Sequence, residues 1–192
     1  LPALYSRFQR REVKVGELEV RAGTPPSAAV FLTRLNGIGR LDEMESTWLE
    51  WETWFIEIQE SHTSYPALNF FRSPVPDHHW VTAAGTVLDA AAFVVSSVDI
   101  PRQPEPQLCL RAGFIGLRRI ADFFGIEYDA DPNQTDPTSI ARQEFDEVYE
   151  GLREAGVPML ADQDQAWNDC AGWRVNYDTV HLQLAELTMA PY

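Results

Sequence analysis

The residues with the clearest potential for chemistry are the histidines and the acids near them. The chain has four histidines, His62, His78, His79 and His181. Asp178 and His181 are three positions apart, so a helix would present both on one face, as in the Glu-x-x-His pairs of di-iron bundles. Those centres need a second pair and two further glutamates, and the sequence has no second pair. His78 and His79 are adjacent and would point about 100° apart on a helix. We therefore expect structural or capping histidines and no metal site.

A second candidate is the polar segment "DADPNQTDP", which resembles the start of a calcium loop. It brings four oxygen-bearing side chains close together: Asp129, Asp131, Asn133 and Asp136. An EF-hand loop also needs glycine at its sixth position and glutamate at its twelfth. Here those positions hold Gln134 and Ile140. The spacing therefore favours a solvated acidic loop.

Asp89 stands in the middle of the apolar run "WVTAAGTVLDAAAFVVSSV", residues 80–98. A carboxylate at the centre of a bilayer costs about 3 kcal/mol on insertion scales, so we expect a buried helix in water and not a membrane span. A buried carboxylate needs a partner or a shifted pKa. Nearby basic residues that follow in the sequence are Arg111, Arg118 and Arg119. We expect an ion pair that fixes helix register and not a catalytic acid.

Composition and motifs argue against an enzyme. "GIGR", residues 37–40, lacks the third glycine of a dinucleotide loop and follows no strand, and no GxSxG, P-loop or HExxH pattern occurs. We predict no catalytic residue and no cofactor. The net charge of −14 makes nucleic acid a poor partner. The two cysteines, Cys109 and Cys170, have no CxxC spacing and indicate a reducing, intracellular location.

Helical periodicity dominates the remaining pattern. One stripe with 3-4 spacing covers residues 41–62: Leu41, Met44, Trp48, Trp51, Phe55, Ile58 and His62. A second covers residues 162–188: Ala166, Cys170, Trp173, Tyr177, Val180, Leu184 and Leu187. Further helices are expected near 79–97, 108–125 and 136–155, with Asp77 as an N-cap, Gly125 as a C-terminal stop and Ser27 in a first turn. The prediction is an all-α bundle of about five to seven helices, and the stripes also permit homo-oligomers.

The first 23 residues differ in charge from the rest. They carry five cations, Arg7, Arg10, Arg11, Lys14 and Arg21, against three acids. "VKVGELEVRAG", residues 13–23, partly alternates between polar and apolar residues and predicts a short strand or an extended arm. We therefore divide the chain into a basic arm, residues 1–23, and a helical domain, residues 24–192.

Three stretches carry a family resemblance: "SRFQRREVKV", "WLEWETWFIEIQESHTSYPALNFFRS" and "WVTAAGTVLDAAAFVVSSVD". Together they resemble the cytoplasmic C-terminal region of bacterial membrane proteins of the two-transmembrane, potassium-channel-like family. The matching residues are Trp51, Trp54, Glu60, Ser61, His62, Ser64, Tyr65, Pro66, Phe71, Arg72 and Ser73. The resemblance covers roughly residues 1–125.

The resemblance implies a pore segment upstream of Leu1, and a position for this domain on the cytoplasmic face of the cell membrane. Leu1, Leu4, Tyr5 and Phe8 would be the last residues of an inner helix. Arg7, Arg10, Arg11 and Lys14 would lie near inner-leaflet lipid. The sequence has no Thr-x-Gly-Tyr-Gly filter, so it cannot conduct ions alone.

The expected role is therefore a regulatory or assembly domain. The alternative is a stand-alone helical binding module, in which the 41–62 stripe forms a groove for an apolar ligand or a partner helix.

Overall fold

The computed structural model describes residues 1–191. Over this range the chain is all-helical, and β-structure is limited to an isolated bridge between Val98 and Met159. The elements are α1 (Pro2–Ala22), α2 (Ala28–Gly37), α3 (Glu45–Ser64), the 3₁₀ helix η1 (Pro66–Phe70), α4 (Trp80–Ser97), α5 (Glu105–Phe123), α6 (Arg142–Glu154), α7 (Gln163–Arg174) and α8 (Asp178–Thr188). The all-α bundle is confirmed. Its eight α-helices in this range exceed the five to seven expected, partly because segment 162–188 folds as two helices.

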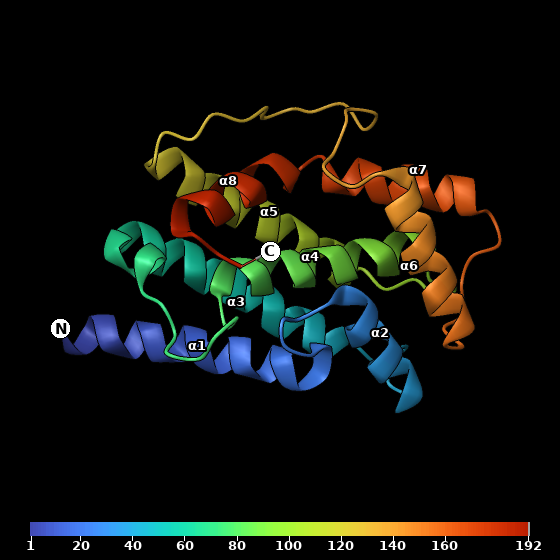
Figure 1. Ribbon diagram of the computed structural model, residues 1–192, viewed down its shortest axis with the longest axis horizontal. Coiled ribbons are helices and arrows are strands. Elements are labelled where there is room, and N and C mark those ends of the chain that lie inside the picture. Colours follow the sequence, from blue (N-terminus) through green and yellow to red (C-terminus); the bar gives the residue numbers. More distant parts are fainter. Residues whose placement is uncertain (192) are drawn as a thin grey trace.

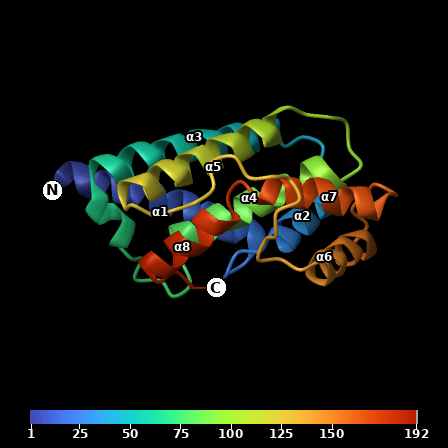
Figure 2. The same cartoon turned by 90° about the horizontal axis from the view of Figure 1, so that it is seen from above.

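Helix α4 is the centre of the bundle (Figure 1). It packs against α1, α2, α5, α7 and α8, and α3 lies alongside α5 (Figure 2). Of its 18 residues, 15 are buried. Within the described chain it is the one helix long and apolar enough to cross a membrane, yet 83% of that window is buried by the other helices. The apolar side chains of α4 therefore pack inside the core of the bundle.

Two glycines allow the central helices to approach closely. A Cβ added at Gly113 on α5 would collide with the Leu88 side chain on α4 and press on the Phe55 ring on α3. A Cβ at Gly85 would overlap the imidazole of His181 on α8. Larger residues at either position would force the helices apart.

The N-terminal segment is a helix and not the extended arm that we expected. Arg11, Val15, Leu18 and Ala22 are its buried residues. Their 4-3-4 spacing places them on one helical face, against the bundle. The polar–apolar pattern of residues 13–23 fits the two-residue period of a strand as well as the 3.6-residue period of a helix. The segment is helical because this conformation buries Val15, Leu18 and Ala22 together. Gly23, at φ 85°, ends it.

The aromatic stripe of α3 is core. Every stripe residue from Leu41 to His62 is buried. The stripe is thus covered by the protein's own helices, and it does not form the open groove that the binding-module alternative required. The stripe of residues 162–188 faces inward over most of its length, with Ala166, Cys170, Tyr177, Val180 and Leu184 buried, whereas Trp173 is half-buried and Leu187 is 38% exposed.

Helix boundaries follow capping groups, some of which were predicted correctly. Ser27 caps α2 by accepting a hydrogen bond from the Val30 amide, and Gly125, at φ 67°, follows α5 as expected. Helix α4 is capped by the His79 side chain and not by Asp77, because His79 Nδ1 accepts from the Val81 amide at 3.1 Å. These local bonds satisfy amides that have no partner within the helix.

Two helix limits were predicted incorrectly. Helix α6 begins at Arg142 and not near residue 136, because Glu144 accepts from the Ala141 amide at 2.7 Å and fixes the first turn there. The predicted 162–188 helix is interrupted after Arg174, and α8 starts at Asp178. The 3-4 spacing continues through the break, so the pattern gave no sign of it.

Candidate functional site

The buried face of α1 is held by one arginine. The Arg11 side chain is 2% exposed. Its guanidinium donates to the carbonyl oxygens of Leu68 and Phe71, each at 2.7 Å, and to Glu12 at 2.8 Å. Its Nη1 also lies 3.2 Å from His62 Nε2. We call these five residues the Arg11 cluster. It joins α1 to the end of α3 and to η1.

The segment that forms the other side of this cluster is the one that carried the family resemblance. Pro66 starts η1, and Asn69 Nδ2 donates to the carbonyls of His62 and Pro66, both at 2.9 Å. The indole of Trp80 donates to the Asn69 carbonyl at 3.2 Å and packs 4.8 Å from the His62 ring. The turn is therefore closed by the Asn69 side chain and by the Phe71 amide, which donates to the Leu68 carbonyl at 3.3 Å, and Arg11 on α1 is a further donor to the Leu68 and Phe71 carbonyls.

The same segment reaches the other end of the chain. Arg72 donates to the carbonyls of Thr188 and Met189, at 3.1 and 3.0 Å. Thr82 on α4 donates to the Pro191 carbonyl at 2.9 Å. Residues 60–73 thus connect the first helix with the last one.

His78 adds a second polar link to α1. Its Nδ1 lies 3.0 Å from a Glu19 oxygen, and its Nε2 lies 3.2 Å from a Glu12 oxygen. The three side chains are 9%, 13% and 16% exposed, in the order His78, Glu19 and Glu12. His78 is therefore a structural residue between two carboxylates of one helix.

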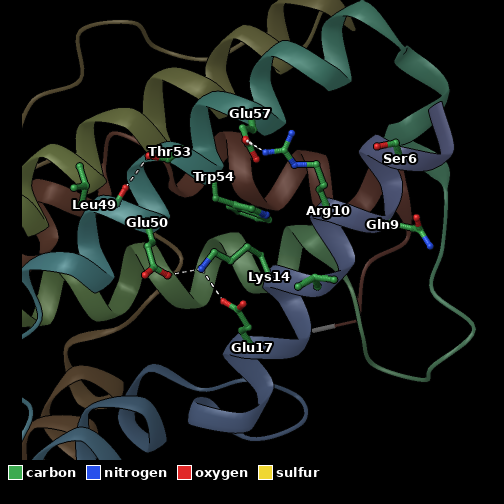
Figure 3. Close-up of a pocket in the computed structure, with 11 residues that line it drawn as sticks. Ser6, Gln9, Arg10, Lys14, Glu17, Leu49, Glu50, Thr53, Trp54 and Glu57 are labelled. Atoms are coloured by element: carbon green, nitrogen blue, oxygen red, sulfur yellow. Dashed lines mark hydrogen bonds and ion pairs between the residues drawn. The ribbon is translucent and has the colours of Figure 1, made fainter. Parts of the chain in front are cut away.

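An open groove of about 740 Å³ runs along the outer side of α1, between α1 and α3 (Figure 3). Val13 and Leu49 are exposed in it, and the buried Trp54 ring forms part of its wall. Ion pairs bridge it, from Arg10 to Glu57 at 2.8 Å and from Lys14 to Glu50 at 2.6 Å. The hydroxyl groups in the groove are those of Ser6 and Thr53, the latter donating to the Leu49 carbonyl, and the charged groups of the groove are already paired.

The four cations assigned to a lipid surface occupy different environments. Arg11 is buried, so it is not part of the exposed basic surface. Lys14 is shared by Glu17 and Glu50, and these hydrogen bonds raise its pKa against the opposing effect of burial. Arg10 is 63% exposed beside Glu57, and Arg7 is exposed. Only Arg7 and Arg10 remain candidates for lipid contact.

The buried His62 ring is neutral, and its surroundings disfavour the protonated imidazolium. Burial, and next the charge of Arg11, lower its pKa to about 3. Ser61 donates to the Glu57 carbonyl, which leaves its oxygen to accept from His62 Nδ1 at 3.0 Å. Nε2 then accepts from Arg11. A proton on Nε2 would point at the guanidinium.

We therefore expect acid to weaken the fold before the carboxylates titrate. An unfolded histidine takes a proton near pH 6.5, and folded His62 does not do so until about pH 3. The unfolded state binds more protons between these values, so the free energy of unfolding falls as pH falls, by up to about 1.4 kcal/mol per pH unit for this group. Urea unfolding at several pH values between 6.5 and 4.5 measures the slope.

The His62→Gln variant is the control, because its amide oxygen can accept from Arg11 and does not titrate. In this variant the free energy of unfolding should fall less steeply with pH, and the difference from the natural chain should correspond to about one proton fewer taken up on unfolding. The dependence on pH should not vanish, because burial also lowers the pKa of His79, to about 4. An unchanged slope in this variant would show that His62 does not cause it.

Asp89 has an ion-pair partner, but not one of the arginines that we expected. Its Oδ1 accepts from Arg174 Nη1 at 2.5 Å and from the Tyr177 hydroxyl at 2.7 Å. Arg118 instead donates to the carbonyls of Asn176 and Ala130, and Arg119 donates to Gln59. The ion pair joins α4 to α7, two helices that sequence order does not make neighbours.

Asp178 and His181 have separate structural roles. Asp178 accepts from the amide and hydroxyl of Ser139, each at 2.7 Å, and from Arg174 Nε at 2.8 Å. His181 Nε2 lies 3.0 Å from the Val81 carbonyl, and burial lowers its pKa, so a neutral ring donates there. Among residues 1–191, no group of three or more potential ligands, the 129–136 loop included, could hold a metal ion.

Sequence reasoning missed Arg174, Tyr177 and Ser139, which surround Asp89 and Asp178. Burial opposes the charge of Arg174, but Asp89, Tyr177 and Asp178 outweigh it and raise its pKa. Burial, and next the charge of Asp89, raise the pKa of Tyr177 well above 10. The one available signal was the i, i+4 spacing of Arg174 and Asp178.

Comparison with known proteins identifies no relative: no family model, curated protein or solved structure matches the chain. The fold defines the class of the protein only as an all-α bundle.

Proposed function

We propose that this chain is the cytoplasmic regulatory or assembly domain of a potassium-channel-like membrane protein, with α1 as the coupling helix. The observation that carries the proposal is the Arg11 cluster. It is built by the segment whose sequence resembles that family, and it fixes the direction of α1 relative to the bundle. A domain can bias a pore only through an element whose position differs between states.

The exposed start of α1 supports the same role. Leu1 is 99% exposed and Tyr5 is 60% exposed, whereas Val15, Leu18 and Ala22 are completely buried. The helix is therefore anchored along most of its length, and its exposed N-terminal end reaches past the neighbouring helices (Figure 2). A helix upstream of Leu1 would continue this axis. Arg7 and Arg10 would then face inner-leaflet lipid.

The gene provides the first test. We expect the codons upstream of Leu1 to encode an apolar span and a Thr-x-Gly-Tyr-Gly filter. Rubidium uptake into liposomes that hold the full-length protein should then depend on that filter. A reading frame with no apolar span upstream of Leu1 would contradict the proposal. The stand-alone binding module would then be the better assignment, and it would have to use the groove of Figure 3, because the α3 stripe is buried.

A further inference from the structure

A small pocket lies where α4, α6 and α7 meet, remote in sequence from the α1 contacts. Its volume is about 90 Å³, the space of about three water molecules. Aromatic rings form much of its wall. Phe93 stacks on Phe145 with centroids 5.3 Å apart, and Trp167 lies 5.4 Å from Phe145. Ile140, Val148, Cys170 and Ala171 supply the rest of the apolar surface. We call it the α4–α6–α7 pocket.

Asp89 gives this apolar pocket a charged end. Its Oδ1 is used by Arg174 and Tyr177, and no hydrogen bond within residues 1–191 reaches Oδ2. The Asp89 side chain is 29% exposed, although 15 of the 18 residues of α4 are buried. Asp89 also lines the pocket. Asp89 Oδ2 is therefore an acceptor that can take a further hydrogen bond.

The balance of charge favours a cation. Arg174 is the one guanidinium that lines the pocket, and it is shared between Asp89 and Asp178. Glu144 also lines the pocket and uses only Oε2 for its contact with the Ala141 amide. The lining thus holds two carboxylates, Asp89 and Glu144, against one guanidinium that is also paired with Asp178 outside the lining, so an anion would meet net repulsion and a cation net attraction.

We propose that the α4–α6–α7 pocket binds a small primary ammonium compound with a short unbranched apolar chain. The ammonium group donates to Asp89 Oδ2, and the chain lies against Phe93, Phe145 and Trp167. The volume excludes a bulky body, and an apolar wall favours a chain over a polar ligand. The proposal is independent of the channel-like role, because it rests only on this pocket.

Three probes of the same chain length separate charge from apolarity: n-butylammonium, 1-butanol and butyrate. We expect saturable shifts of the Trp167 indole resonance, assigned with Trp167→Phe, in ¹H–¹⁵N spectra titrated with n-butylammonium. Butanol should bind roughly tenfold more weakly, the equivalent of one modest charge interaction. Butyrate should not saturate. Absence of saturation by n-butylammonium, or equal affinity for butanol or butyrate, would overturn the proposal.

Two variants test the position of the ligand. Asp89→Asn keeps an oxygen for Arg174 and Tyr177 but removes the charge, so n-butylammonium should lose its roughly tenfold advantage over butanol. Ala171→Leu fills the pocket from α7 and should abolish binding of both probes. Near-ultraviolet circular dichroism confirms that each variant is folded. If folded Ala171→Leu binds n-butylammonium as the natural chain does, the ligand lies elsewhere and the proposal is wrong.

Discussion

Replacing Arg174 with methionine should lower the free energy of unfolding by about 3–5 kcal/mol, the usual cost of removing one member of a buried ion pair. The Arg174 side chain is 11% exposed and bridges Asp89 and Asp178. Without it, Asp89 retains only the Tyr177 hydroxyl. Asp178 retains Ser139. The buried Asp178 carboxylate, 8% exposed, and the half-buried Asp89 carboxylate would then have no cation between them. Urea unfolding at pH 7 measures the loss.

A second substitution separates the charge from the packing. If the uncompensated carboxylate is the cause, adding Asp89→Asn to Arg174→Met should recover part of the lost stability, so the two changes should not be additive. Arg153→Met is the matched control, since Arg153 is 64% exposed beside Glu150 and should matter by less than about 1 kcal/mol. An Arg174→Met variant as stable as that control would show that the ion pair contributes nothing.

The need of Asp89 for a partner was predictable from sequence, but the identity of the partner was not. A carboxylate in an apolar helix must be compensated wherever the helix packs. The choice of partner depends on which helix lies across from it. Helix α4 is apolar and buried on almost every side, so its sequence does not indicate which helix lies beside Asp89, and Arg174 on α7 is 85 positions away. Expecting the next helix in the sequence to supply the arginine was therefore wrong.

The N-terminal segment shows a similar limit. From the sequence alone, Arg7, Arg10, Arg11 and Lys14 have the same role as exposed cations. In the fold Arg11 is buried, whereas its neighbour Arg10 is 63% exposed. The spacing of Arg11 from Val15 and Leu18 was a usable signal, because it places the arginine on the apolar face. Two of its partners are the backbone carbonyls of Leu68 and Phe71, and backbone carbonyls leave no mark in a sequence. The cluster was thus visible only in the fold.

The resemblance in residues 60–73 was easier to see than to explain. The sequence singled out Ser61, His62 and Arg72 without a chemical reason, because no catalytic pattern includes them. In the fold, Ser61 orients the His62 ring, and Arg72 binds carbonyls at the end of α8. The sequence pattern identified residues 60–73, and the contacts in the fold show that this segment holds α1 and the end of α8 in place.

Replacing Arg11 with methionine should detach α1, with a loss of about 3–5 kcal/mol in the free energy of unfolding. Methionine is apolar and similarly long, so the change removes the charge and the donors with little change in volume. The carbonyls of Leu68 and Phe71 would lose these hydrogen bonds, and Glu12 would face His78 without its cation. Burial lowers the pKa of Arg11, against the opposing effect of Glu12. Burial of the charged guanidinium is thus unfavourable, and its hydrogen bonds and Glu12 compensate for it.

Hydrogen exchange distinguishes a detached helix from a uniformly weakened fold. In Arg11→Met, amides of α1 should lose more protection than amides of α5, to which Arg11 makes no hydrogen bond. Arg10→Met is the control on the same helix, because its pair with Glu57 is exposed and should contribute less than about 1 kcal/mol. Equal loss of protection in α1 and α5 would mean that Arg11 stabilises the whole bundle and does not set the attachment of α1. The proposed coupling role of α1 would then lose its main support, whatever segment precedes Leu1.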